Sequence, residues 1–214
     1  MEPDDRGAAA AGRIVSLREV TGDETLFVLA ASPGDESLAC GGLIAEACAS
    51  GRPPLVAVLT DGTRLGPLRA AIAEDVLARR HAEETRHAVS LLGLPTDRLF
   101  LLGFYDGTAP SDGRLFDAGV EAIGFLMWSR DCNVLCAPLA EAGCNDRRAA
   151  RAMARAVAAR TGVGLLGFGE AGPERRLVLD TVRFAARKAG AVAAHAALGP
   201  QALPAHPETF FRPD

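Results

Sequence analysis

Apolar residues occur along this chain in short uninterrupted runs that alternate with longer stretches of helical spacing. The runs are rich in strand-forming residues, and the longer stretches repeat their apolar positions every three or four residues. Strands are predicted at 25–31, 55–59, 98–102, 133–137 and 164–168, with 176–179 as a candidate sixth. Helices are predicted at 38–50, 70–92, 117–130, 146–161 and 183–198.

This alternation predicts βαβ units and therefore a mostly parallel sheet covered by helices on both faces. We expect one domain over residues 1–214, a Rossmann-like three-layer α/β sandwich of about five strands, with residues 1–13 flexible. Ligands of such sheets bind beyond the carboxyl ends of the strands. A shallow pocket is expected there, bordered by Ser32–Glu36, Asp61–Arg64 and Glu141–Arg147.

Composition narrows the classes of partner. Hydrophobic residues make up 49% of the chain, and 23 basic residues stand against 27 acidic ones, for a net charge of −4. No basic cluster is interleaved with aromatic residues, so we expect no nucleic acid as partner. No apolar run has the length of a membrane span, and acids occupy the start where a signal peptide needs basic residues. A cytoplasmic protein without a membrane partner is expected, and its wealth of alanine and arginine indicates GC-rich, bacterial coding.

Two motif matches carry little weight. Gly162, Gly164 and Gly167 fit the dinucleotide fingerprint G-x-G-x-x-G, but they follow a predicted helix and lead into a strand, which reverses the order that this site needs. His81, Glu84 and His87 lie on one predicted helix and have the residue types of a zinc site, yet we interpret that charged run as a solvated face.

The cysteines are odd in number and lack a secretory signal, which predicts reduced thiols. Cys132 and Cys136 are separated by four residues of predicted strand, about 13 Å, so they cannot bind one metal ion together. We expect the five cysteines to serve as small buried hydrophobic residues. They are Cys40, Cys48, Cys132, Cys136 and Cys144.

One stretch is more specific. Residues 28–42 read V-L-A-A-S-P-G-D-E-S-L-A-C-G-G, a predicted strand, a turn and the start of a helix. This stretch resembles the opening motif of the PIG-L/LmbE-type zinc N-deacetylases, in which a strand ends in A-H-P-D-D-E and a G-G pair follows. The likeness extends over roughly residues 14–198. Further matching positions are Thr60-Asp61-Gly62, Arg80, Glu84, Asp106-Gly107, Ala137–Ala150, Lys188 and His195.

The resemblance implies zinc-dependent hydrolysis of N-acetylglucosaminyl-type substrates, but the working positions differ. Ser32 stands at the first ligand histidine, Gly34 at the general base and Asp35 at the retained ligand. Cys144 stands at the oxyanion histidine and Arg147 at the last ligand histidine. Catalytic zinc needs about three protein ligands, and glycine cannot accept a proton. We therefore expect no catalytic residue, no metal and no other cofactor.

The resemblance therefore implies a pocket that keeps some lining residues of the family site but lacks the residues that bind the metal and catalyse the reaction. Its expected remnants are Ser32, Asp35, Glu36, Asp61, Arg64, Asp146 and Arg147. Because an unpaired carboxylate in a cleft is costly, Arg147 is expected to pair with Asp35, or failing that with Glu36, in place of the metal.

Three hypotheses on function follow. The first is a deacetylase-family protein that has lost catalysis and binds a partner protein or a small glycan-like ligand. The second is an active hydrolase, an N-deacetylase with rebuilt chemistry, which would use the metal-binding or nucleophilic groups of Asp35, Glu36, Asp146 and Cys144, or Ser32 as nucleophile. No histidine lies in these loops to act as base. The third is a nucleotide-binding module, for which the chain has no fingerprint. The oligomeric state is not readable from the sequence.

Overall fold

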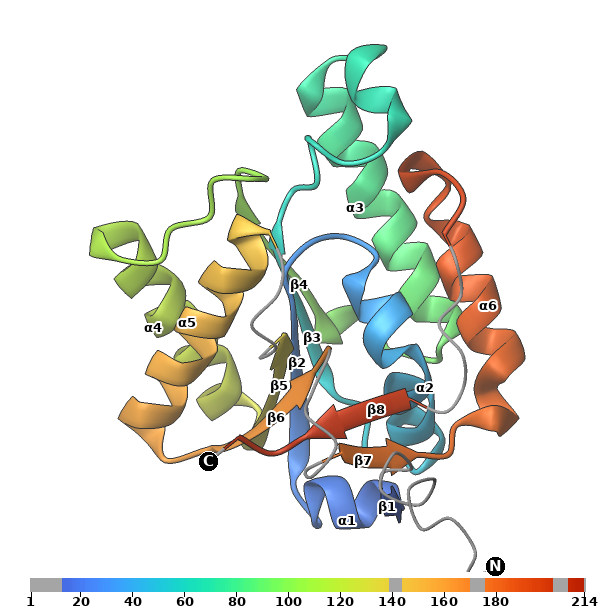
Figure 1. Cartoon of the computed structure of the whole chain (residues 1–214), viewed down its shortest axis with the longest axis vertical. Coiled ribbons are helices and arrows are strands. Elements are labelled where there is room, and N and C mark those ends of the chain that lie inside the picture. Colours follow the sequence, from blue (N-terminus) through green and yellow to red (C-terminus); the bar gives the residue numbers. More distant parts are fainter. Residues whose placement is uncertain (1–12, 139–143, 170–175, 202–207, 214) are drawn as a thin grey trace, which may run out of the picture.

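The computed structural model describes residues 13–138, 144–169, 176–201 and 208–213. It is a three-layer α/β domain around one central sheet, as expected (Figure 1). The sheet has eight strands in the order β1-β7-β8-β6-β5-β2-β3-β4. The strands are β1 Arg13–Val15, β2 Thr25–Ala30, β3 Leu55–Thr60, β4 Leu99–Phe104, β5 Cys132–Pro138, β6 Gly164–Phe168, β7 Arg176–Leu179 and β8 Glu208–Phe211.

The predicted strand number of about five is therefore wrong. β7 confirms the candidate sixth strand, while β1 and β8 are additions with three and four residues. Each is too short to show a clear hydrophobic period, and β1 includes Arg13 from the range expected to be flexible. β8 lies between β7 and β6 and is antiparallel to both, whereas every other described pairing is parallel.

The helices cover both faces of the sheet. α2, α3 and α6 lie on one side, and α4 and α5 lie on the other (Figure 1). The helices are α1 Leu17–Thr21, α2 Asp35–Ala49, α3 Glu74–Leu91, α4 Gly113–Ser129, α5 Asn145–Thr161 and α6 Ala185–Ala194. The central strands β2 and β3 are buried on both faces, which is why they read as continuous apolar runs.

Two predicted helices were too long. The one expected at 70–92 begins as a separate 3-10 turn, Pro67–Ala70, before α3 starts at Glu74. The one expected at 183–198 reduces to α6 flanked by 3-10 turns at Val182–Phe184 and Ala196–Leu198. The second of these turns brings Leu198 to the loop after β2. No helix among the described residues has the length and hydropathy needed to cross a bilayer.

Candidate functional site

The loop after β2 leads directly into α2 at the carboxyl edge of the sheet. Gly34 precedes α2 with φ of +94°, a left-handed conformation that glycine adopts without strain. A Cβ atom placed on Gly34 would lie 2.6 Å from Cδ1 of Leu198. The position expected for the general base thus has no side chain, and the apolar Leu198 fills the space next to it.

Asp35 and Arg147 form the predicted ion pair. Arg147 lies in the first turn of α5, and its Nη2 donates to Oδ1 of Asp35 at 2.6 Å while its Nε donates to Oδ2 at 3.4 Å. Both carboxylate oxygens are therefore engaged, in the fork geometry that favours arginine. This confirms the expectation that Arg147 pairs with Asp35.

Only the acidic partner of this pair is buried. The side chain of Asp35 is 11% exposed and that of Arg147 is 47% exposed. Burial raises the pKa of Asp35, and the guanidinium of Arg147 opposes this without reversing it. The hydrogen bond and charge of Asp35 raise the pKa of Arg147, so the cation is permanent.

Glu36 does not line an open pocket, although it was expected among the pocket remnants. It is fully buried and accepts hydrogen bonds from the Gly34 amide at 2.9 Å and from the Ser37 hydroxyl at 2.8 Å. Its Oε1 lies 2.8 Å from Nε2 of His195. Burial would raise the pKa of Glu36, but the hydrogen bond and charge of His195 outweigh it and lower that pKa.

Ser37, His195 and Glu36 include the residue types of a hydrolytic triad, but their geometry is different. Ser37 Oγ and Glu36 Oε1 both contact the same ring nitrogen, Nε2, at 3.3 and 2.8 Å. A triad needs the nucleophile on one ring nitrogen and the carboxylate on the other. All three side chains are also buried, so this cluster stabilises the start of α2.

Asp146 is held by the neighbouring loop. Its carboxylate accepts the amide hydrogens of Gly107 at 2.7 Å and Ala109 at 3.2 Å. Asp106 lies beside it, and burial together with a hydrogen bond to Asp146 raises the pKa of Asp106 to about 6. Asp146 therefore connects the start of α5 to the loop after β4, rather than presenting a free ligand.

Hydrogen bonds also connect the loops after β2, β3 and β4, through Ser32, Asp61 and Arg64. Asp61 accepts from the Thr63 hydroxyl at 2.8 Å and from the Asp106 amide at 3.1 Å. The Arg64 amide donates to Asp106 at 2.9 Å, while its guanidinium lies 5.1 Å from the ring centre of Tyr105. Ser32 is buried and accepts from the Thr60 hydroxyl. These loops do meet at one edge of the sheet, but the far border of the expected pocket, beginning at Glu141, lies partly outside the described residues.

Cys144 departs from the expectation of buried cysteines. It is exposed and is the N-cap of α5, but its side chain makes no capping hydrogen bond. Cys40, Cys132 and Cys136 are buried as expected, and Cys48 is partly buried. Burial raises the pKa of Cys48 and of Cys132 to about 11, which keeps both as inert thiols.

His81 was wrongly assigned to a solvated face. It is fully buried, together with Leu77, Thr85 and Ala88, because these positions share the face of α3 that packs inward. Neither ring nitrogen of His81 has a hydrogen-bond partner among the described residues. Burial lowers the pKa of His81, so the ring is neutral.

Sequence reasoning missed a second, deeply buried ion pair. Lys188 of α6 donates to Oε1 of Glu208 in β8 at 2.5 Å, and both side chains are at most 2% exposed. The two oxygens of Glu208 also accept the amide hydrogens of Gly42 at 2.7 Å and Leu43 at 2.8 Å. The only lysine of the chain, placed in an apolar helix, was the available signal for a buried acid partner.

The residues at the expected ligand positions do not fit zinc. Asp35 is the one donor of a suitable type there, and both of its oxygens are taken by Arg147, which cannot bind a cation. Within the described residues, no group of three His, Cys, Asp or Glu side chains is placed to hold a metal ion.

Comparison with known proteins identifies the family. The family model for GlcNAc-PI de-N-acetylase, PIG-L, matches residues 26–161, which span β2 to α5. The chain belongs to this family. No curated protein sequence matches it.

Solved structures share the fold at low sequence identity. N,N'-diacetylchitobiose deacetylase from Pyrococcus horikoshii superposes with a TM-score of 0.70 at 17% identity, covering 86% of this chain and 77% of that one. The conserved protein TT1542 from Thermus thermophilus gives 0.57 at 22%, covering 81% and 79%. GalB, the 4-carboxy-2-hydroxymuconate hydratase from Pseudomonas putida, gives 0.66 at 16%, covering 81% and 79%. Because a hydratase and a deacetylase share this fold, the fold alone does not define the reaction.

Proposed function

We propose that this chain is a non-catalytic member of the de-N-acetylase family, which binds a protein partner or a small glycan-like ligand in the cytoplasm. The observation that carries the proposal is the Asp35–Arg147 pair, in which a guanidinium occupies both oxygens of the carboxylate that was expected to be the retained ligand. A guanidinium stabilises a carboxylate, but it neither activates water as zinc does nor accepts a proton from it.

The surroundings support the same proposal. Gly34 offers no base, and Leu198 covers its position. The carboxylate of Asp146 accepts hydrogen bonds from two backbone amides. The carboxylate of Glu36 is hydrogen-bonded to a backbone amide, a serine and a histidine within the fold. The retained acids therefore hold loops together, and restoring the family's activity would need several simultaneous changes.

Metal content gives the direct test. We expect protein purified without chelators to contain far less than one equivalent of zinc or iron, and to leave N-acetylglucosaminides intact when zinc is added. The double variant Ser32→His/Arg147→His would free Asp35 and supply two nitrogen ligands, so it should gain zinc binding. The matched control Arg148→His changes a neighbouring arginine of α5 and should gain none. One tightly bound metal ion in the unmodified protein would refute the proposal.

The second candidate is a hydrolase that uses Cys144 as nucleophile, favoured only by the exposure of that thiol at the start of α5. A thiolate there would be alkylated by iodoacetamide much faster than a free thiol of ordinary pKa. We expect iodoacetamide to alkylate Cys144 at the rate of an unactivated thiol, and we expect Arg147→Ala to leave that rate unchanged. Fast alkylation that depends on Arg147 would favour the hydrolase instead.

A further inference from the structure

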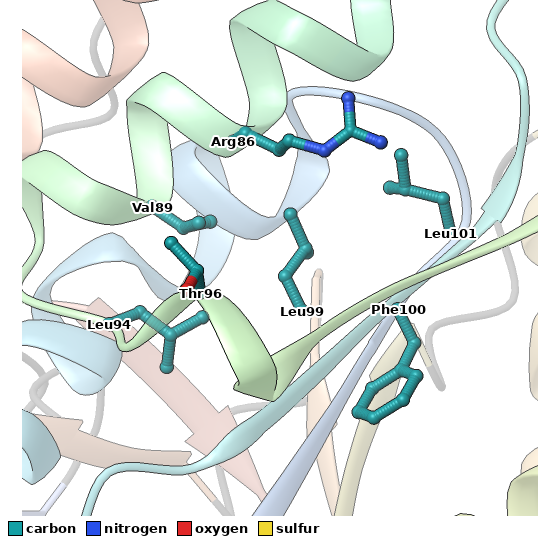
Figure 2. A pocket seen from close by; sticks show the side chains of 7 residues that line it. All are labelled: Arg86, Val89, Leu94, Thr96, Leu99, Phe100 and Leu101. Carbon is teal, nitrogen blue, oxygen red and sulfur yellow. The ribbon is translucent and has the colours of Figure 1, made fainter.

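A cavity lies between α3 and the edge strand β4 (Figure 2). Its volume is about 320 Å³, at the lower end of the range of small-molecule sites, about 300–1,000 Å³. It is lined by Arg86, Val89, Leu94, Thr96, Leu99, Phe100 and Leu101. Four apolar side chains, those of Val89, Leu94, Leu99 and Leu101, line it on the side of α3, so the walls favour a hydrocarbon group.

The alternation of side chains along β4 decides which of them face the cavity. Leu99 and Leu101 extend toward α3, whereas Phe100 points to the opposite face of the sheet, as alternation along a strand requires (Figure 2). Val89 and Leu94 are buried and close the inner end. An apolar chain lying along Leu99 and Leu101 would thus contact apolar side chains of both β4 and α3.

One end of the cavity is polar. Arg86 extends its guanidinium over Leu101 (Figure 2), and within the described part of the chain it has no hydrogen-bond or ion-pair partner. Thr96 lines the cavity near Leu94, and its hydroxyl likewise makes no hydrogen bond to another described residue. β4 ends the sheet order, so its outer backbone edge has no partner strand among the described residues. A free cation beside an apolar slot is complementary to an anion with a hydrocarbon tail.

We propose that this cavity binds a small monocarboxylate with a short unbranched or branched hydrocarbon chain, with its carboxylate on Arg86 and its chain along Leu99 and Leu101. The site uses none of the residues at the family's catalytic positions, so the proposal does not depend on the proposed function. It would hold equally for an active or an inactive deacetylase-family protein.

Sodium hexanoate is the probe, and calorimetry together with methyl NMR of Val89, Leu99 and Leu101 is the measurement. We expect hexanoate to bind and to move these methyl signals, and acetate, which lacks the chain, to leave them unchanged. 1-Hexanol and hexylammonium, which lack the anion, should bind at least about tenfold more weakly. Hexyl phosphate distinguishes the headgroup, because tighter binding of it than of hexanoate would overturn the assignment to carboxylates.

Variants locate the contact. Arg86→Gln should weaken hexanoate binding about tenfold, while Arg86→Lys keeps the charge and most of the affinity. Arg79→Gln, on the same helix but paired with Asp75 and outside the cavity, is the matched control and should bind as the unmodified protein does. Leu101→Trp should fill the slot and abolish binding, with circular dichroism to verify its fold.

Several results would overturn the proposal: no saturable binding of hexanoate, equal binding by Arg86→Gln, or equal binding of hexanol and hexanoate. Concentration-dependent dimerisation that broadens the same methyl signals would also overturn it, since a second copy would then cover the cavity. Because Arg86 is an exposed side chain, its substitution tests binding without disturbing the fold.

Discussion

Two of the ion pairs that contact or adjoin α2 have opposite surroundings. Lys188 and Glu208 meet at the middle of the helix, where neither side chain is more than 2% exposed. Asp35 and Arg147 meet at its start, where the arginine is 47% exposed. Breaking a buried pair leaves an uncompensated charge inside the protein, whereas water compensates an exposed one. The buried pair is therefore part of the fold, and the exposed pair occupies a place where the fold tolerates different chemistry.

The largest effect is expected at the buried pair. Glu208→Gln would leave the Lys188 ammonium buried without a counter-charge, and should lower the free energy of unfolding by about 3–5 kcal/mol. Denaturant titration measures this. The double variant Lys188→Met/Glu208→Gln should cost less than the two single changes added together, because it removes both charges. Additive costs would contradict the comparison.

A smaller loss is expected when an acid is returned to the base position. Gly34→Asp forces a left-handed backbone and a contact with Leu198, and should destabilise the protein by about 2–3 kcal/mol. Adding Leu198→Ala should recover part of that loss by opening space. Thermal unfolding of both variants is the measurement, with Gly34→Ala/Leu198→Ala to isolate the backbone contribution, because a Cβ alone on Gly34 already contacts Leu198. Full stability of Gly34→Asp would show that Leu198 does not close the site.

The Glu36–His195 pair predicts a dependence on pH. The pKa of Glu36 is lowered, so its contribution to stability is present above its ordinary value of 4.5 and is lost as the pH falls. Burial would lower the pKa of His195, but the hydrogen bond and charge of Glu36 raise it above 6.5, so its contribution is present below 6.5 and is lost as the pH rises.

Both contributions are complete between pH 4.5 and 6.5. The stability difference between the unmodified protein and Glu36→Gln should therefore be greatest in that window, by about 1–2 kcal/mol relative to alkaline pH. Unfolding titrations of both proteins at a series of pH values measure it. A difference that is constant with pH would mean that the pair carries no charge.

The smallest effect is expected at the exposed pair. Arg147→Ala should lower stability by about 1 kcal/mol or less at neutral pH, since water screens the half-exposed guanidinium. The loss should vanish in acid, where Asp35 is protonated whether or not Arg147 is present. The pKa of Asp35, followed by carboxyl NMR, should rise further in this variant. An unchanged pKa of Asp35 would mean that the ion pair is not formed in solution.

The same contrast explains what could be predicted from the sequence. Strands β2 and β3 were found because burial on both faces leaves uninterrupted apolar runs, as in 55–59. β8 was missed because its four residues have too little pattern, and Glu208 alone gives no sign that it faces two backbone amides. The Asp35–Arg147 pair was predicted because the family resemblance put both residues at one site, where a carboxylate and a guanidinium of opposite charge attract each other. The burial of His81 was missed because a polar residue on an inward face breaks the pattern that defines that face.

The position of β8 has a consequence for how the chain folds. β7 and β1 connect to the rest of the sheet through β8. The amides of Gly42 and Leu43 donate hydrogen bonds to Glu208, which lies 166 and 165 residues further along the chain. Contacts of such long sequence separation form late, because loop closure costs entropy before any contact compensates for it. During synthesis, β1 and the middle of α2 therefore emerge first and are completed last. Until β8 is available, the nascent protein has an open sheet edge at β6, a site where premature association with another chain would begin.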